Sequence, residues 1–124
     1  MTHLESITQK IVTLDEAKQI VAEWKTAGEK IVFTNGCFDI IHKGHVSYLA
    51  KARDLGTKLI LGLNTDESVK RLKGANRPVK ELESRALTVA SFEYIDLVIP
   101  FSEDTPLKVI STLLPDVLVK GGDY

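Results

Sequence analysis

Four short, continuous apolar runs recur along this sequence, and longer stretches with helical periodicity separate them. The runs lack strict alternation of apolar and polar residues, which is typical of strands that are covered on both faces. Strands that alternate with helices predict a parallel sheet with right-handed crossover connections. The predicted strands are Lys30–Thr34, Lys58–Leu63, Tyr94–Pro100 and Asp116–Lys120.

The stretches between these runs carry apolar residues at helical spacing and have recognisable ends. Thr13, followed by Asp15 and Glu16, is a typical helix start, and Gly28 closes that stretch. The predicted helices cover residues 13–28, 46–56, 81–92 and 105–113. The pattern predicts a doubly wound, Rossmann-like α/β fold with a parallel sheet of four to five strands and flanking helices.

Length and charge limit what the chain can be. Its 124 residues suit one domain, residues 1–124. The 16 basic and 17 acidic residues give a net charge of −1, so no overall field attracts nucleic acid or an anionic membrane. The single cysteine cannot form an internal disulfide, and the first 30 residues lack the apolar run of a signal peptide or membrane span. We therefore expect a cytoplasmic protein.

Each predicted strand ends in polar residues unlike the strand itself. In doubly wound sheets, ligands bind beyond the carboxyl ends of the strands. Polar strand ends suit such a cleft, although solvated loops have the same composition. These ends are Asn35–Asp39, Asn64–Asp66, Ser102–Asp104 and Gly121–Asp123.

The segment from Thr34 to His45 carries the strongest chemical signal. His42 and His45 are three residues apart where a helix is predicted to begin, so both imidazoles can lie on one side of its first turn. Free N–H groups of that turn and the helix dipole favour an anion, and Gly36 and Gly44 allow it to approach the backbone. Imidazole donates to phosphate oxygens whether neutral or protonated, so the segment predicts a phosphate site.

Three other interpretations compete with a phosphate site. The histidines could only cap the helix start, Cys37 could join them as a zinc ligand, and the glycines could serve turns and packing. The full spacing Gly-x-Phe-Asp-x-x-His-x-Gly-His, directly after a strand, favours one phosphate site over these three together. We therefore predict no metal site in the protein.

Residues 34–49 resemble the signature of the nucleotidyltransferase superfamily that carries a His-x-Gly-His motif. From about Thr13 to the last residue, the chain is also similar to the adenylyltransferase domains of the bacterial ADP-heptose synthase family. Agreement at five separated places carries this resemblance: Phe33–Asp39, Asn64–Val69, Arg77–Val79, Glu103–Leu107 and Lys120–Tyr124.

The resemblance implies transfer of AMP from ATP to heptose 1-phosphate, with Mg²⁺ on the triphosphate and release of pyrophosphate. It implies that His42, His45 and Lys73 hold the phosphates and stabilise the transition state. It places nucleotide binding at Asn35, Gly36, Cys37, Phe38, His42, Gly44, His45, Gly121, Gly122 and Asp123. It places acceptor binding at Asp39, which contacts the acceptor or orders its loop, and at Asn64, Asp66, Lys73, Arg77 and Arg85.

Five basic residues crowd positions 70–80, together with Gly74 and Pro78. We expect a mobile flap that brings Lys73 and Arg77 onto the triphosphate or the acceptor phosphate; a solvated loop is the alternative. Arg85, at the start of the next predicted helix, is expected to face the site.

The resemblance also implies a further strand and a Ser/Thr-Thr-x-Ile motif at a helix start, whereas this sequence stops at Tyr124. We expect a single domain without that C-terminal strand and helix, either a fragment or a short form. A cytidylyltransferase acting on glycerol 3-phosphate or a similar alcohol phosphate is one alternative function, and a nucleotide-binding module without turnover is another. The expected partners are small molecules and a second copy in a homodimer, with no nucleic acid and no membrane.

Overall fold

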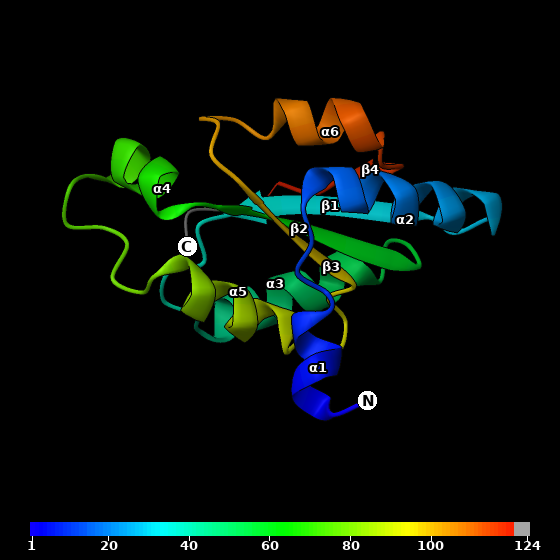
Figure 1. The fold of residues 1–124 in the computed structure, drawn as a ribbon, viewed down its shortest axis with the longest axis horizontal. Helices are drawn as coiled ribbons and strands as arrows, with labels where there is room; N and C mark the ends of the chain where they lie inside the picture. The colour runs from blue at the N-terminus through cyan, green and yellow to red at the C-terminus, as the bar shows by residue number, and fades with distance from the viewer. Residues whose placement is uncertain (121–124) are drawn as a thin grey trace.

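The computed structural model describes residues 1–120, and within them a four-stranded parallel sheet lies between two layers of helices (Figure 1). The strands are β1 (Ile31–Gly36), β2 (Lys58–Asn64), β3 (Leu97–Phe101) and β4 (Val117–Leu118). Their order across the sheet is β3-β2-β1-β4, and every pairing is parallel. The predicted doubly wound α/β fold is therefore confirmed.

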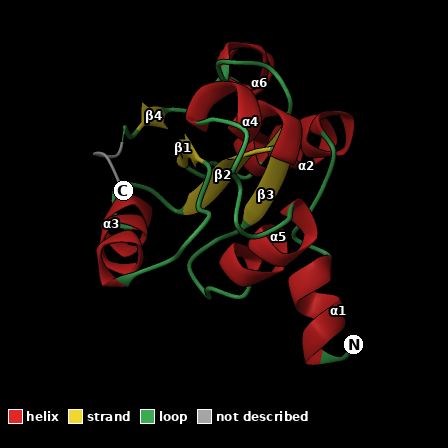
Figure 2. Cartoon of the chain, turned by 90° about the vertical axis from the view of Figure 1, so that its left-hand side faces the viewer, coloured by secondary structure: helices red, strands yellow, loops and turns green. Residues whose placement is uncertain are grey.

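The helices divide between the two faces of the sheet. The helices α2 (Leu14–Thr26) and α6 (Leu107–Leu113) cover one face, and α3 (Lys43–Arg53) and α5 (Leu82–Ala90) cover the other (Figure 1). Helix α4 (Asp66–Lys73) follows β2 at the carboxyl edge of the sheet, and Figure 2 views the molecule from that side. No helix of residues 1–120 is long and apolar enough to cross a membrane.

The connections diverge next to β1. The chain runs outward from β1 through β2 to β3, and then crosses back to β4 on the other side of β1. The chain leaves β1 for α3 on one face of the sheet and reaches β4 from α6 on the other face. This reversal of direction leaves a crevice at the carboxyl edge beside β1.

Two apolar cores explain why the strand sequences are continuous apolar runs. Successive residues of a strand point to opposite faces. In β1, Val32 packs toward α3 and α5, whereas Ile31 and Phe33 pack toward α2 and α6. In β2, Leu61 and Ile60 divide in the same way. Both faces are covered, so neither set of alternate positions can be polar.

Strand β1 is longer than predicted. Asn35 and Gly36 pair with Gly62 and Leu63 of β2 rather than forming a turn. The chain turns later, at Phe38, whose φ is 45°. The predicted end of the strand at Thr34 is wrong because the parallel pairing continues through Asn35 and Gly36.

Strand β3 begins later than predicted, at Leu97 rather than Tyr94. The Asp96 carboxylate accepts hydrogen bonds from the Leu59 N–H (2.7 Å) and from Arg53 Nε (3.0 Å). These two hydrogen bonds hold Asp96 against the start of β2, so the turn ends at Asp96 and β3 begins at the next residue.

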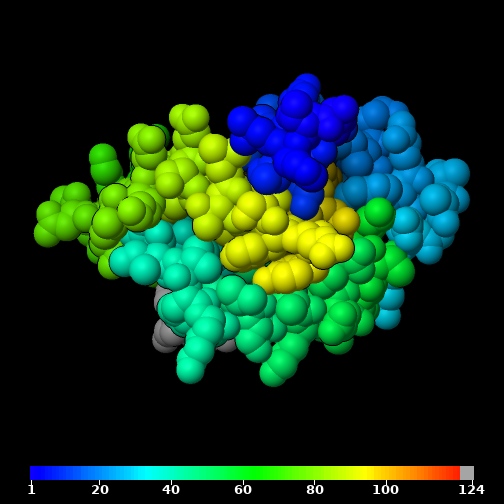
Figure 3. Space-filling view, turned by 90° about the horizontal axis from the view of Figure 1, so that it is seen from below, coloured from blue at the N-terminus to red at the C-terminus, as the bar shows by residue number. Residues whose placement is uncertain are grey.

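Two helices were not predicted. Helix α1 (His3–Thr8) packs against α5, and the segment after it pairs with the outer edge of β3 through Val12 and Val98 (3.0 Å). Figure 3 shows α1 in blue beside α5.

Helix α4, the second helix that was not predicted, contains Lys70, Arg71 and Lys73 in its last turn and ends at Gly74. The expected basic flap is therefore helical in its first part, and a loop only from Gly74 onward.

The turn between α3 and β2 leaves no space for a side chain at Gly56. A Cβ there would lie 2.6 Å from the Lys30 carbonyl oxygen and 2.7 Å from Val32 Cγ2. We expect Gly56→Ala to lower the free energy of unfolding by about 1–3 kcal/mol, because backbone has to shift. Urea unfolding measures this change. The neighbouring Leu55→Ala, at an exposed position, is the control and should stay within about 0.5 kcal/mol; equal losses would contradict the packing argument.

Candidate active site

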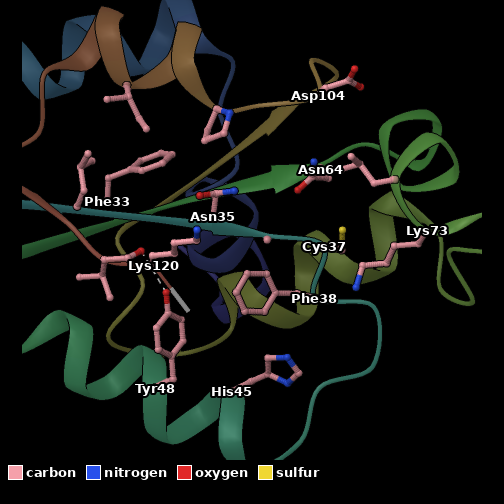
Figure 4. A pocket seen from close by; sticks show the side chains of 16 residues that line it. Phe33, Asn35, Cys37, Phe38, His45, Tyr48, Asn64, Lys73, Asp104 and Lys120 are labelled. Carbon is pink, nitrogen blue, oxygen red and sulfur yellow. Dashed lines mark hydrogen bonds between the residues drawn. The ribbon is translucent and has the colours of Figure 1, made fainter. Parts of the chain in front are cut away.

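A cavity of about 790 Å³ opens at the carboxyl edge of the sheet, where β1 and β4 separate (Figure 4). It lies at the position that a doubly wound sheet provides for ligands. Side chains from β1, α3 and α4 point into it, and Asp104 of the loop after β3 lies at its outer side (Figure 4). The lining residues used below are Asn35, Gly36, Cys37, Phe38, His45, Tyr48, Asn64, Lys73, Asp104 and Lys120.

The end of β1 forms one wall through contacts of Phe38. A Cβ at Gly36 would lie 2.7 Å from Phe38 Cε2, so the ring occupies the space that the missing side chain leaves. The same ring lies beside the imidazole of His45, with a centroid distance of 5.4 Å. Packing of Phe38 therefore accounts for glycine at position 36.

His42 and His45 cap the start of α3 reciprocally. His42 Nδ1 accepts the Gly44 N–H (3.0 Å), and His45 Nδ1 accepts the His42 N–H (3.2 Å). Each neutral ring therefore carries its proton on Nε2. The Gly44 N–H donates to His42 Nδ1 and the His45 N–H donates to the His42 carbonyl, so both N–H groups have acceptors within the protein.

The two histidines differ in position. His45 is buried and lines the cavity, whereas His42 is exposed at the helix start, with the ring centroids 4.2 Å apart. Burial, with smaller electrostatic contributions from the neighbouring His42 and Lys73, lowers the pKa of His45 below its ordinary 6.5. His45 therefore meets the cavity as a neutral ring near pH 7.

Cations and amides line the wall opposite α3. Lys73 extends from α4 toward the cavity, and Asn64 lies at the end of β2 with its Nδ2 donating to Ser68 Oγ (2.9 Å) (Figure 4). Cys37 is half-buried between them, and burial raises the pKa of its thiol. Together with His45, these groups form a cavity rich in hydrogen-bond donors.

Asp39 does not line the cavity. Its carboxylate is buried and accepts hydrogen bonds from Arg77 Nε (2.9 Å), Val79 N–H (2.7 Å) and Lys80 N–H (2.7 Å). Burial alone would raise the pKa of Asp39, but the N–H groups and the Arg77 guanidinium outweigh it and lower the pKa. Asp39 and Arg77 thus order the loop before α5, which is one of the two roles expected for Asp39.

Arg85 also lies away from the cavity. Its side chain is fully buried, and its guanidinium donates to three backbone carbonyls and to Asp66. Asp66, predicted as an acceptor ligand, is therefore paired with Arg85 at the start of α4. The structure brings Arg85 and Asp66 together but turns both toward protein groups.

Three polar lining residues, Tyr48, Asp104 and Lys120, are not among the predicted site residues. The Tyr48 hydroxyl hydrogen bonds with Thr34 and donates to the Val119 carbonyl (3.3 Å), which ties α3 to β1 and β4. Tyr48 follows His45 by three residues, a spacing that places both on one side of the helix. Asp104 belongs to a polar strand end that the sequence identified without assigning a role, and Lys120 is the second residue after β4.

The zinc alternative finds no support within residues 1–120, where no group of three or more His, Cys, Asp or Glu side chains is placed to hold a metal ion. Both Nδ1 atoms of the histidine pair already accept backbone N–H groups. The predicted nucleotide ligands Gly121, Gly122 and Asp123 lie outside the described residues.

Comparison with known proteins agrees with this fold. Residues 33–124 match the family described as Cytidylyltransferase-like. The chain therefore belongs to the cytidylyltransferase-like family, and the resemblance to nucleotidyltransferases seen in the sequence is confirmed.

Two curated relatives are similar to most of this chain. The chain is 55% identical over 122 residues to the bifunctional protein HldE of Actinobacillus pleuropneumoniae serotype 5b, covering 98% of this chain and 26% of that protein. It is 58% identical over 114 residues to the bifunctional protein HldE of Sodalis glossinidius, covering 92% and 24%. The chain thus spans about a quarter of the length of these curated relatives.

A solved structure shares the fold. The crystal structure of the lipopolysaccharide core biosynthesis protein from Thermoplasma volcanium GSS1 superimposes with a TM-score of 0.66 at 30% identity, covering 73% of each chain.

The lowered pKa of His45 predicts how stability depends on pH. The folded state favours the neutral ring, so this contribution is complete above pH 6.5 and is lost as the pH falls below it. We expect the free energy of unfolding to fall between pH 7 and pH 5, by at most about 1.4 kcal/mol per pH unit from this group. Urea unfolding of the wild type and of His45→Asn, which keeps an acceptor that does not titrate, measures the difference.

His3→Asn is the matched control, because His3 is exposed on α1, and it should keep the pH dependence of the wild type. An equal fall in the wild type and in His45→Asn would contradict the assignment to His45.

Proposed function

We propose that this chain is an adenylyltransferase that transfers AMP from ATP to heptose 1-phosphate. An oxygen of the sugar phosphate attacks the α-phosphorus of ATP, the bond from that phosphorus to the bridging oxygen breaks, and pyrophosphate leaves. The product is ADP-heptose, and no covalent enzyme intermediate is needed. The resemblance to the ADP-heptose synthase family and the likeness to two HldE proteins support this choice of substrates.

The observation that carries the proposal is that His45 and Lys73 line the same cavity. This cavity lies where the order of the strands reverses. Its volume of about 790 Å³ is within the range of about 300–1,000 Å³ for small-molecule sites. Asn35 and Asn64 supply neutral polar groups along the same edge. The cavity thus combines cationic and hydrogen-bonding groups of the kind that a triphosphate and a sugar phosphate require.

His45 would act as a neutral donor. Its Nδ1 accepts a backbone N–H, so Nε2 carries the proton and can donate to a phosphate oxygen on which charge develops. The lowered pKa keeps the His45 ring neutral near pH 7, and Lys73 would supply the positive charge. His42 would hold the orientation of His45 through the reciprocal cap and a ring contact at the helix start.

Mg²⁺ enters the proposal as the ion carried by the triphosphate. Asp104 is the carboxylate among the described lining residues, and it is paired with Arg71 Nε at 2.9 Å. This donor set fits an ion held mainly by phosphate oxygens and water, as Mg²⁺ is in many nucleotide sites. Mg²⁺ would neutralise charge on the departing pyrophosphate.

A cytidylyltransferase acting on glycerol 3-phosphate or a similar alcohol phosphate is the second candidate, and the family match favours it. The likeness to a lipopolysaccharide core biosynthesis protein favours a sugar acceptor and a role in making a precursor for lipopolysaccharide. A cytoplasmic homodimer remains a prediction, and light scattering of the purified chain tests the pairing.

A substrate panel separates these functions. The purified chain is incubated with Mg²⁺, with ATP or CTP, and with heptose 1-phosphate or glycerol 3-phosphate, and pyrophosphate release is measured. We expect release with ATP and heptose 1-phosphate, because the resemblance pairs those substrates. Release with CTP and glycerol 3-phosphate instead would favour the second candidate. Calorimetric binding of ATP without release in any mixture would indicate a binding module.

The role of His45 is tested by His45→Ala. Loss of one donor already placed at a developing charge should lower kcat by about 100-fold or more. His3→Ala changes an exposed histidine of α1 and should keep wild-type turnover. A His45→Ala protein that is folded and turns over like the wild type would remove His45 from the mechanism.

A further inference from the structure

The fully buried guanidinium of Arg85 joins four separate parts of the chain. From α5, Arg85 Nη1 donates to the carbonyls of Cys37 and Asn64, each at 2.8 Å. Nε donates to the Lys80 carbonyl at 2.9 Å, and Nη2 donates to the Asp66 carboxylate at 2.6 Å. These acceptors lie after β1, at the end of β2, at the start of α4 and just before α5.

Each of these acceptors is connected to the cavity. Cys37 and Asn64 line it directly. Asp66 begins α4, whose Lys73 lines it from the far end of that helix. Lys80 belongs to the loop that Asp39 holds through two backbone N–H groups. A single side chain therefore sets the relative positions of the β1 end, the β2 end, α4 and the loop before α5.

Arg85 is not placed to touch a ligand. It is 1% exposed, it is absent from the lining of the cavity, and its three nitrogens all donate to protein acceptors. We infer that Arg85 is a positioning residue for the nucleotidyl transfer proposed above, acting through the backbone of Cys37 and Asn64. The expected effect of Arg85 on turnover rests on that proposed function. The expected effect of Arg85 on the positions of Cys37 and Asn64 does not.

The chemistry of arginine suits this role. A guanidinium presents five donors in one plane, so it can satisfy several carbonyls that converge from different directions. Lysine has three donors on a single atom and cannot span the same set. We therefore expect Arg85→Lys to keep the positive charge but not the hydrogen bonds to all four acceptors.

The single cysteine offers a measurement that needs no nucleotide. Cys37 is half-buried, its own carbonyl accepts from Arg85, and burial raises its thiol pKa, so iodoacetamide should alkylate it slowly. Arg85→Gln leaves the carbonyls without their shared donor, so the segment opens more often. We expect alkylation of Cys37 to become about tenfold faster or more.

Arg53→Gln is the matched control. Arg53 is partly buried and, like Arg85, donates to a carboxylate and to a backbone carbonyl, here those of Asp96 and Gly56. These two acceptors lie at the opposite edge of the sheet. Its loss should lower the melting temperature without changing the alkylation rate of Cys37 by more than about twofold.

Turnover is measured on the same proteins with ATP, Mg²⁺ and heptose 1-phosphate. Folded Arg85→Gln should lose about 100-fold in kcat, since small displacements of positioned groups cost that much, while Arg53→Gln keeps kcat. Added guanidinium ion should restore part of the activity of Arg85→Ala and none of that of His45→Ala. Unchanged alkylation in folded Arg85→Gln overturns the inference, and so does faster alkylation with unchanged kcat.

Asp66→Asn decides the matter if Arg85→Gln does not fold. Asp66 is partly exposed, so the substitution is tolerated sterically while it weakens the hold on Arg85. Faster alkylation with a lower kcat supports the inference, and wild-type behaviour in both assays overturns it. A wild-type protein without turnover on any substrate defeats the proposed function, whereas the alkylation rates still decide whether Arg85 positions the cavity wall.

Discussion

The burial of one guanidinium holds together the edge of the sheet at which the cavity forms. Parallel strands all end at the same edge, and their last carbonyls have no further strand residue to pair with. Arg85 satisfies the carbonyls of Cys37 and Asn64 there and neutralises its own charge against Asp66. A buried charge is costly unless every donor is paired, and here the pairing that relieves that cost also sets the shape of the cavity wall.

The histidine pair caps a helix, and in the proposed reaction the same geometry would prepare His45 for its chemical role. A helix start needs acceptors for its first N–H groups, and the Nδ1 atoms of His42 and His45 supply them. That bond leaves the proton on Nε2, which is the atom a phosphate would meet. Helix capping and phosphate binding are therefore compatible, because the cap leaves the Nε2–H of His45 available in the proposed reaction. His45 lines the cavity because it lies one turn inside the helix, next to Phe38.

Some charged residues near the cavity bond to other protein groups and so hold its wall in place, whereas others line the cavity. Asp39, Arg77 and Arg85 are engaged by protein groups, whereas Lys73 faces the cavity. The basic residues of α4 complement the negative end of its helix dipole, and Thr65, Asp66 and Gly74 are ordinary start and stop signals. The sequence prediction does not contain α4, because a mobile basic flap explains the same charges at positions 70–80.

The sequence by itself determined the alternation of strands and helices, the burial of both sheet faces and the position of the histidine pair at a helix start. These features depend on neighbours within a few residues, which periodicity and spacing report directly. Only the tertiary structure decided that His45 rather than His42 lines the cavity, that Tyr48, Asp104 and Lys120 join it, and that Arg85 turns inward. Arg85 meets Cys37 across 48 positions and Asn64 across 21, and contacts over such separations arise from the packing of α5 onto the sheet.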